Sequence, residues 1–507
     1  MRYGFVIDQT RCIGCHACTV ACKEENGVPL GVFRTWVKYV EKGAFPDTRR
    51  HFAVLRCNHC DHAPCVTICP TVALYRRPDG IVDFDSGRCI GCKSCMQACP
   101  YDALYIDPDT HTAAKCHFCA HRVEVGLEPA CVIVCPVRAI LAGDLDDPAS
   151  EVARVIAREP VSVRKPEQGT KPKLFYVGAD QATLTPALQQ SSASTLWGQR
   201  VGEPVSLASM LESAGAWTPP PRATPRPVEA LGRTVYDIDH EARPWGWRVS
   251  TYLWTKSIAA GAALVGVLGA VFGWPGGGGV ALPLAALTFI LLTTILLVVD
   301  LKRPDRFHYI LLKPNWRSWL VWGAWILIAF GGVTGLWILS VLSFRLDAIA
   351  WLAAPLVALA LAAAGYSAFL FAQAEGRDFW QSPLVLPHLL IAAVAAGAAM
   401  ALLLHGPSPA LRGLLLAALG VNLLLILAER LTPHANVDVA AAARWITEGP
   451  GRAAFWGGVV VVGTLLPALL LLASSWLTAG LAGLLALAGL YVWEDCWVKA
   501  GQSVPLS

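Results

Sequence analysis

The chain has 507 residues, of which 55% are hydrophobic and 15% are charged, and its formal net charge is +4. This small charge excludes a strongly basic nucleic-acid-binding protein, so no nucleic-acid partner is expected. The averages hide two unlike parts, because residues 1–180 are charged and rich in Cys whereas residues 250–495 are mostly Leu, Ala, Val, Gly and Trp.

Sixteen of the 17 cysteines lie before residue 136, in four groups of four, and we interpret the remaining Cys496 as structural. In the first and third groups the spacing is C-x2-C-x2-C-x3-C, and Pro follows the last Cys of three groups. This spacing is typical of bacterial ferredoxins, in which three cysteines hold one iron–sulfur cluster and the fourth ligates another. The groups are Cys12, Cys15, Cys18 and Cys22; Cys57, Cys60, Cys65 and Cys69; Cys89, Cys92, Cys95 and Cys99; and Cys116, Cys119, Cys131 and Cys135.

Zinc and disulfides are the alternatives for so many cysteines. Zinc sites usually use two pairs separated by a longer loop, which these runs do not follow. Residues 1–25 contain no apolar leader, so we expect a reducing compartment in which disulfides are rare. Nearby histidines either tune cluster potentials through hydrogen bonds to sulfur or are ordinary loop residues. These are His59, His62, His117 and His121.

Regular structure is predicted sparsely before residue 245. Residues 81–85 (IVDFD) predict a short strand, and residues 152–159 (VARVIARE) have helical spacing. Residues 181–245 are rich in Pro, Ser, Thr and Ala, and the run TPPPRATPRP (218–227) indicates an extended linker along the surface of the first domain.

Eight apolar stretches are each near the length of about 20 residues that a bilayer core requires. An even number of crossings puts residues 1–180 and the tail on one side, where the loops carry ten Lys or Arg against two on the other side. This excess predicts a cytoplasmic N-terminal domain. The stretches are 252–273, 280–300, 318–341, 346–373, 383–404, 409–428, 454–474 and 476–494. Ionisable residues at the membrane edge of that side are Lys256, Asp300, Glu375, His388, Glu429, Glu494 and Asp495.

Residues 1–180 resemble the four-cluster electron-transfer subunit of molybdopterin oxidoreductases such as dimethyl sulfoxide, polysulfide and thiosulfate reductases. The resemblance includes CNHCDHAPCVTICP (57–70) and LEPACVIVCP (127–136). It implies that the outer groups exchange ligands with each other, as do the inner ones, to hold four [4Fe–4S] clusters. The implied first set is Cys12, Cys15, Cys18 and Cys135; the second is Cys22, Cys116, Cys119 and Cys131; the third is Cys57, Cys60, Cys65 and Cys99; and the fourth is Cys69, Cys89, Cys92 and Cys95.

The second part resembles the NrfD/polysulfide-reductase membrane-subunit family in VVDLKRPDRFHYILLKPNWRSWLVWGAWIL (298–327) and YLWTKSIAAGA (252–262). That family implies eight or more helices, no haem, and a site for menaquinone or ubiquinone near the face where the cluster subunit docks. His388 and His405 belong to one predicted helix, which also favours a haem-free bundle.

The resemblance implies that the quinone pocket draws on the start of the first helix and on neighbouring helix ends. Here these positions are Tyr252, Trp254, Lys256 and Asp300, and Lys256, Asp300 and His388 are the candidates for proton handling. The sequence departs from the polysulfide-reductase branch at this helix start, because TKS stands where that branch has Asn and His.

We therefore predict an α+β ferredoxin-like iron–sulfur domain (1–180), a linker (181–245) and an all-α bundle of eight transmembrane helices (246–507). Such a chain would carry electrons between quinone and a catalytic partner in a bacterial or archaeal inner membrane. No P-loop, Rossmann fingerprint or catalytic triad is present, so the family resemblance implies a separate molybdenum or tungsten bis-pterin subunit. Two alternatives are an ion-translocating electron-transfer subunit and a part of a quinol:cytochrome c oxidoreductase.

Overall fold

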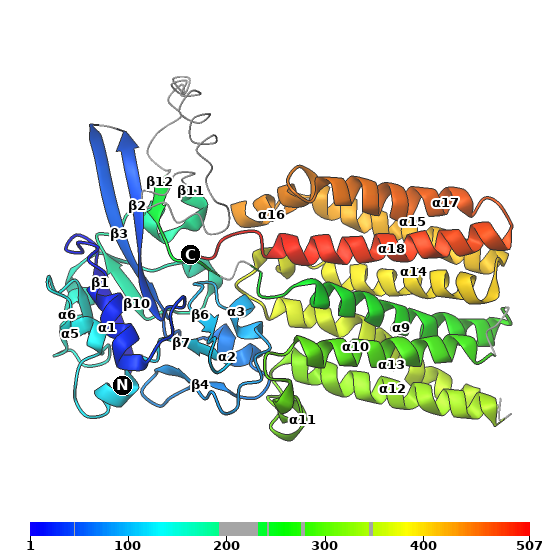
Figure 1. Ribbon diagram of the computed structural model, residues 1–507, viewed down its shortest axis with the longest axis horizontal. Helices are drawn as coiled ribbons and strands as arrows, with labels where there is room; N and C mark the ends of the chain where they lie inside the picture. Colours follow the sequence, from blue (N-terminus) through cyan, green and yellow to red (C-terminus); the bar gives the residue numbers. More distant parts are fainter. Residues whose placement is uncertain (45, 192–231, 241–242, 275–278, 344–347) are drawn as a thin grey trace, which may run out of the picture.

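The computed structural model describes residues 1–44, 46–191, 232–240, 243–274, 279–343 and 348–507. The N-terminal part carries all of the strands in this described portion, and a bundle of long helices follows it (Figure 1). The tail of the chain returns from the last helix to the N-terminal part, so the two parts meet at one end of the bundle (Figure 1).

A four-stranded sheet forms one side of the N-terminal part, with the order β8-β1-β10-β9. Strand β1 is parallel to β10 and antiparallel to β8. Helix α6 (Glu151–Arg158) confirms the predicted helix, and it begins where the Ser150 hydroxyl accepts a hydrogen bond from the Ala153 N–H at 3.3 Å. The strands are β1 (Tyr3–Asp8), β8 (Ile140–Asp144), β9 (Val161–Ser162) and β10 (Leu174–Val177).

A second four-stranded sheet, in the order β11-β12-β2-β3, contains the long hairpin of β2 (Thr35–Ala44) and β3 (Asp47–Arg56). Strand β12 (Gly232–Tyr236) is antiparallel to β2 and parallel to β11 (Gln189–Ser191). Both strands come from the segment 181–245 that we predicted as a linker. Its described flanks thus extend the sheet of the N-terminal part, whereas the run 218–227 lies outside the described residues.

Short helices and two small hairpins carry the cysteines. Strand β5 (Val82–Phe84) confirms the predicted strand. Three of these helices follow a non-glycine residue in the left-handed region, namely His16, Lys93 and Cys119 at φ of 60°, 62° and 48°. The elements around the cysteines are α1 (Ala17–Asn26), α2 (Pro64–Ile68), β4 (Leu74–Arg76), β5, α3 (Ser94–Ala98), β6 (Leu104–Ile106), β7 (Ala113–Lys115), α4 (Ala120–Val123) and α5 (Ala130–Ile133). Later in the chain follow η1 (Pro166–Gln168), α7 (Gln181–Leu184) and η2 (Pro186–Leu188).

Seven helices of the described residues are long and apolar enough to cross a membrane. The eighth predicted stretch is a shorter apolar run, Ala454–Leu470, in which the π-helix η5 (Ala454–Leu465) passes into α17 (Leu466–Leu470). Seven of the eight predicted stretches are therefore confirmed as candidate spans in the described residues, and the count of eight stays a prediction. The seven are α9 (Trp247–Phe272), α10 (Ala281–Asp300), α12 (Trp319–Leu342), α13 (Ala348–Ala372), α14 (Val385–His405), α15 (Pro409–Leu431) and α18 (Trp476–Gly501). Shorter elements between them are η3 (Pro304–Arg306), α11 (Tyr309–Leu312), η4 (Asp378–Gln381) and α16 (Val437–Thr447).

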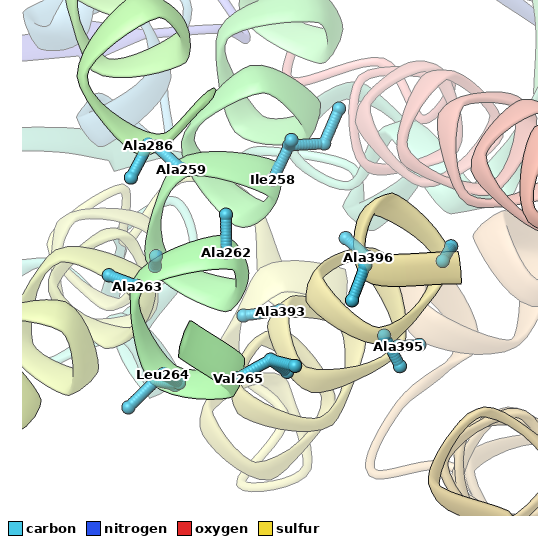
Figure 2. Close-up of a cluster of buried hydrophobic side chains, with 14 of the residues drawn as sticks. Ile258, Ala259, Ala262, Ala263, Leu264, Val265, Ala286, Ala393, Ala395 and Ala396 are labelled. Atoms are coloured by element: carbon cyan, nitrogen blue, oxygen red, sulfur yellow. The ribbon is translucent and has the colours of Figure 1, made fainter. Parts of the chain in front are cut away.

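Helix α9 is the most deeply buried of the seven spans, and small residues bring it close to α14. Figure 2 shows α9 beside α14, with buried small side chains such as Ala262 of α9 and Ala393 and Ala396 of α14. At Gly261 and Gly397 the two backbones meet, because a Cβ built on either residue would contact the backbone of the other helix. Small residues permit this approach in a bundle that gains little from the hydrophobic effect between its helices.

Polar side chains fix the N-terminal part against the bundle. Gln502 at the end of α18 accepts from the Gln97 side chain at 2.6 Å and donates to the Trp245 carbonyl at 2.9 Å. The Asn315 amide donates to the Cys69 carbonyl at 2.7 Å, in the loop before α12. The loops of the second and third cysteine groups therefore lie directly on the membrane domain.

Candidate functional site

The cysteines are gathered in the interior of the N-terminal part, and all 17 cysteines of the protein are free of disulfides. Twelve of the sixteen predicted ligands are buried, and Cys12, Cys92 and Cys135 are partly buried. Cys15 is exposed. A single buried thiol is chemically inert. Whether these cysteines can bind a metal cluster therefore depends on which of them lie close together in space.

Electrostatic neighbours group the cysteines as the four implied sets. Cys12 interacts with Cys15 and Cys135, although Cys135 lies far away in the sequence. Cysteines of one set are thus brought together from two different groups. The corresponding contacts in the other sets are Cys22 with Cys119 and Cys131; Cys116 with Cys22 and Cys131; Cys65 with Cys57, Cys60 and Cys99; and Cys95 with Cys69, Cys89 and Cys92.

Single contacts between neighbouring sets define their order. Cys18 of the first set interacts with Cys131 of the second. Cys116 of the second set interacts with Cys57 of the third, and Cys95 of the fourth interacts with Cys65 of the third. The four sets therefore form a line, with the fourth next to the membrane domain and the first, which contains the exposed Cys15, at the other end.

The surroundings of the sets fit clusters of negatively charged sulfur. The Ala139 N–H donates to Cys135 at 3.2 Å, and the Ala113 N–H donates to Cys89 at 3.3 Å. Buried nitrogens of Arg56 and His59 have no hydrogen-bond partner among the residues that the structure describes. A buried donor left unpaired is costly, and cluster sulfides are acceptors that would satisfy it. Among the described residues no group of three or more His, Cys, Asp or Glu is spaced for a single metal ion.

The thiols need positive charge nearby if they are to ionise. Burial raises the pKa of Cys18 to about 11 and that of Cys22 to about 12, because the thiolate loses its hydration. The Arg56 guanidinium opposes this effect at both thiols. Iron binds the thiolate form of cysteine, so positive charge from iron or from the buried Arg56 is needed to keep Cys18 and Cys22 ionised.

The four nearby histidines differ in their surroundings. Burial lowers the pKa of His59 well below its ordinary value, and its Nδ1 accepts from the Val82 N–H at 3.2 Å. Burial, and then Arg34, lowers the pKa of His117 to about 4. Both rings are therefore neutral at physiological pH. His121 instead lies near the surface and bonds to Glu25 at 2.7 Å, and His62 is exposed.

A cavity of about 470 Å³ lies between the third cysteine group and the bundle. Cys92 and Ser94 line it on one side, and its other polar lining comes from Tyr252, Thr294, Asp300 and Tyr366. The rest of the lining is apolar and includes Leu, Ile and Val of α10 and α12. An apolar pocket with a few convergent polar groups is the usual form of a small-molecule site.

Two of the five predicted quinone-site residues, Tyr252 and Asp300, line this cavity, and the other three do not. Trp254 donates to the Leu487 carbonyl at 2.8 Å. The fully buried Lys256 donates to Ser367 Oγ at 2.6 Å, and its Nζ lies 4.8 Å from the ring centre of Tyr366, which lines the cavity. Lys256 thus lies behind Tyr366 and outside the cavity lining.

His388 lies further from the cavity, on α14. Its ring centre is 5.4 Å from that of Trp493, and its buried Nε2 has no partner within the described residues. The structure therefore does not bring His388 together with Tyr252 and Asp300.

The sequence did not identify three groups at this site. Lys93 reaches from the third cysteine group to Asp300, with Nζ and Oδ1 3.4 Å apart. Tyr366 carries a hydroxyl within the otherwise apolar stretch 346–373, and this polar group in an apolar segment was the sequence feature that could have identified it. Glu494, predicted only as one of seven membrane-edge groups, interacts electrostatically with Lys256 and Tyr252.

Comparison with known proteins defines the class. Residues 237–494 match the family described as polysulphide reductase, NrfD, and residues 49–145 match the family described as 4Fe-4S dicluster domain. The first match covers half of the sequence, and this protein belongs to the NrfD polysulphide reductase family. With its seven apolar helices it is a multi-pass membrane protein that carries an iron–sulfur domain in the same polypeptide.

Curated relatives match the N-terminal part. A tetrathionate reductase subunit of Salmonella typhimurium is 46% identical over 200 residues, which is 39% of this chain and 80% of the relative. A polysulfide reductase subunit of Wolinella succinogenes is 45% identical over 181 residues, 35% of this chain and 94% of the relative. The arsenate respiratory reductase iron-sulfur subunit of Shewanella sp. is 35% identical over 225 residues, 35% of this chain and 96% of the relative.

Proposed function

We propose that this protein carries electrons between the membrane quinone pool and a separate catalytic subunit through four [4Fe–4S] clusters. The cavity between the third cysteine group and the bundle is the observation that carries this proposal, because Cys92 and the apolar helices line it together. Electron transfer requires donor and acceptor to be close, and a lipid-soluble ligand bound in this cavity would lie beside the fourth set. The N-terminal part is proposed as a ferredoxin-like domain.

Each set of four cysteines would hold one cluster, which when bound accepts and releases one electron at a time. The mutual proximity of the cysteines within each set supports this assignment. The backbone N–H groups of Ala113 and Ala139 donate to Cys89 and Cys135 and would stabilise the negative charge of the cluster sulfur.

The cavity would hold menaquinone or ubiquinone, and no haem is proposed. Leu, Ile and Val of α10 and α12 suit an isoprenoid-bearing ring, while Tyr252 and Asp300 suit its carbonyl oxygens. Lys93 holds the Asp300 carboxylate, and Lys256 with Glu494 lies behind the cavity. Asp300 and Lys256 are the proposed proton-handling groups, and Trp254 and His388 support the bundle.

The electron exit would be at the first set, which is the end of the line with the exposed Cys15. Ile13, Val20 and Ile133 are exposed close in sequence to the cysteines of the first set and suit a protein partner. A molybdenum or tungsten bis-pterin subunit is the proposed partner, because the relatives are named as subunits of tetrathionate, polysulfide and arsenate reductases.

The membrane arrangement is proposed to have eight crossings, with Ala454–Leu470 as the shorter one. The described loops at the end next to the N-terminal part carry Lys302, Arg306, Lys313 and Arg317, which favours the cytoplasmic face of a bacterial or archaeal inner membrane. We propose that the cluster domain ends near residue 180 and that the membrane domain begins near residue 246.

The test is reduction of the clusters by quinol in the purified, detergent-solubilised protein. Four clusters predict about sixteen iron atoms per chain, and added menaquinol or ubiquinol should bleach their visible absorbance. Asp300→Asn should slow this reduction at least tenfold, or about 1.4 kcal/mol in barrier, while iron content stays unchanged. Asp305→Asn is the control, because Asp305 is exposed and pairs with Arg303 outside the cavity. Low iron, or clusters that do not respond to quinol, contradicts the proposal.

Ion translocation is a second candidate function, because Lys256 and Glu494 are buried inside the bundle and charge there is costly. Proteoliposomes would decide it: the lumen pH should then change by more than the protons released in quinol oxidation account for, and Glu494→Gln should abolish this excess while cluster reduction continues. Turnover without such an excess would remove this candidate.

A further inference from the structure

Arg56 is a buried cation at the centre of the cysteine-rich interior. It is the last residue of β3, directly before Cys57, and its side chain has 0% exposed surface. No carboxylate of the described residues forms an ion pair with it. A buried charge is normally paired, so the compensating negative charge must come from another group.

The guanidinium is directed at cysteine sulfur. Nη1 donates to Cys131 Sγ at 3.0 Å, and the group interacts electrostatically with Cys116 and Cys18. The ring of Phe5 packs 4.6 Å from the guanidinium carbon. Nε and Nη2 are buried and have no hydrogen-bond partner within the described ranges of the chain. Two of these cysteines belong to the second set and Cys18 belongs to the first, so Arg56 lies between the two sets.

Cations near the other sets are bound differently. Lys115 donates to the backbone carbonyls of Val82 and Cys116, and Arg306 donates to the carbonyls of Ser86 and Cys89. In the part of the sequence that the structure describes, Arg56 is the one Arg or Lys whose side chain donates to a cysteine sulfur. Arg56 is therefore the cation most closely associated with the sulfur atoms of the second set.

We propose that Arg56 is a fixed counter-ion that raises the reduction potential of the second cluster, and to a smaller extent that of the first. The inference rests on the proposed assignment of clusters to the cysteine sets. Reduction adds one negative charge to a cluster, and a cation with a charge-assisted hydrogen bond to its sulfur stabilises the reduced form in a low-dielectric interior. Arg56 is a positioning residue for electron flow toward the exposed end of the line.

The variant Arg56→Met keeps much of the side-chain volume and removes the charge. We expect the midpoint potential of the second cluster to fall by at least about 59 mV, which corresponds to a tenfold change in its oxidised-to-reduced ratio for one electron. The shift at the first cluster should be smaller, and the third and fourth clusters should not shift. Arg56→Lys should give a smaller shift than Arg56→Met, because it keeps the charge but loses the planar fork.

The measurement is a mediator-poised redox titration of the whole purified protein, followed by electron paramagnetic resonance. The signal of the second cluster is identified by its loss in Cys119→Ser. Arg164→Met is the matched control: Arg164 is 1% exposed, and it donates to the carbonyls of Tyr101, Leu184 and Leu506 rather than to sulfur. Its loss should leave all four potentials unchanged.

The iron content of each purified variant decides which variant is used in the redox titration. If Arg56→Met holds less iron than the wild type, Arg56→Lys is titrated instead, and a downward shift confined to the second and first clusters supports the proposal. Unchanged potentials in a fully loaded variant, or an equal shift in Arg164→Met, overturn it. The titration uses chemical mediators without quinol, so it is independent of whether the quinone proposal fails.

Discussion

At the scale of single residues, His240 stands where the N-terminal part meets the tail of the chain. Its Nδ1 lies 2.7 Å from Asp102 and its Nε2 lies 3.6 Å from Asp237. Burial lowers the pKa of His240, but the hydrogen bonds to Asp102 and Asp237 outweigh this effect and raise the pKa to about 9. The ring is therefore charged at neutral pH.

This raised pKa predicts how stability depends on pH. The contribution of His240 is fully present below its unfolded pKa of about 6.5 and is lost as pH rises through about 9. Its full size is roughly 3 kcal/mol. We expect the melting temperature of the wild type to fall between pH 7 and pH 10 more steeply than that of His240→Gln. Exposed His111→Asn is the control and should follow the wild type. Parallel curves for wild type and His240→Gln would refute the prediction.

The residues that the sequence identified are those whose spacing encodes their chemistry. Cysteines two and three residues apart predict clusters without any knowledge of the fold. Arg56 and Cys131 are 75 positions apart and Lys93 and Asp300 are 207 apart, so only folding brings them together. Their partners were therefore not predictable, although the residue types themselves are visible in the sequence.

At the scale of helices, the crossing of α9 and α14 depends on two glycines. Gly397→Ala would place a methyl group against the backbone of Gly261, and rigid backbone cannot move aside as a flexible side chain can. We expect a loss of about 1–3 kcal/mol in stability and a lower melting temperature in detergent. Gly420→Ala on α15 is the control, because no atom lies within 4 Å of its Cβ. Equal melting of the two variants would show that the crossing tolerates the extra volume.

Hydropathy predicted the long helices because their length and apolar content are local properties. The stretch 454–474 was the exception, since Pro467 lacks a backbone donor and the described helix is a π-helix followed by one short turn of α-helix. Strands β11 and β12 were not predicted from a segment rich in Pro and Ser. Strand β12 pairs with β2 from far earlier in the sequence, and β11 pairs with β12, so neither pairing is visible to a local pattern.

At the scale of the whole molecule, Arg377 joins the two parts from the loop between α13 and α14. It is 6% exposed, its Nε donates to Gln97 at 2.8 Å, and its Nη1 donates to the Val504 carbonyl at 3.0 Å. The pKa of Arg377 is lowered to about 10 by burial, so the charge persists at neutral pH. No sequence pattern predicted this junction, because its members come from three distant segments.

Arg377→Met should loosen the junction while the clusters remain. Leaving Gln97 and the Val504 carbonyl unpaired costs about 1–3 kcal/mol each, so hydrogen exchange should rise in residues 94–99 and 498–504 with no change in iron content. Arg412→Met is the control, because Arg412 bonds to Ser474 at 2.7 Å and takes no part in the junction. Unchanged exchange in Arg377→Met would mean that the remaining contacts hold the junction alone.

The bond between Gln97 and Gln502 has a consequence for biogenesis. Its two members are separated by 405 positions, so a ribosome completes the iron-binding half long before Gln502 leaves the exit tunnel. This bond must then wait for insertion of α18, although contacts such as that of Asn315 with Cys69 come from segments that emerge earlier. The nascent polypeptide thus has a period in which the cysteine sets are already synthesised but the junction at Gln502 is still open.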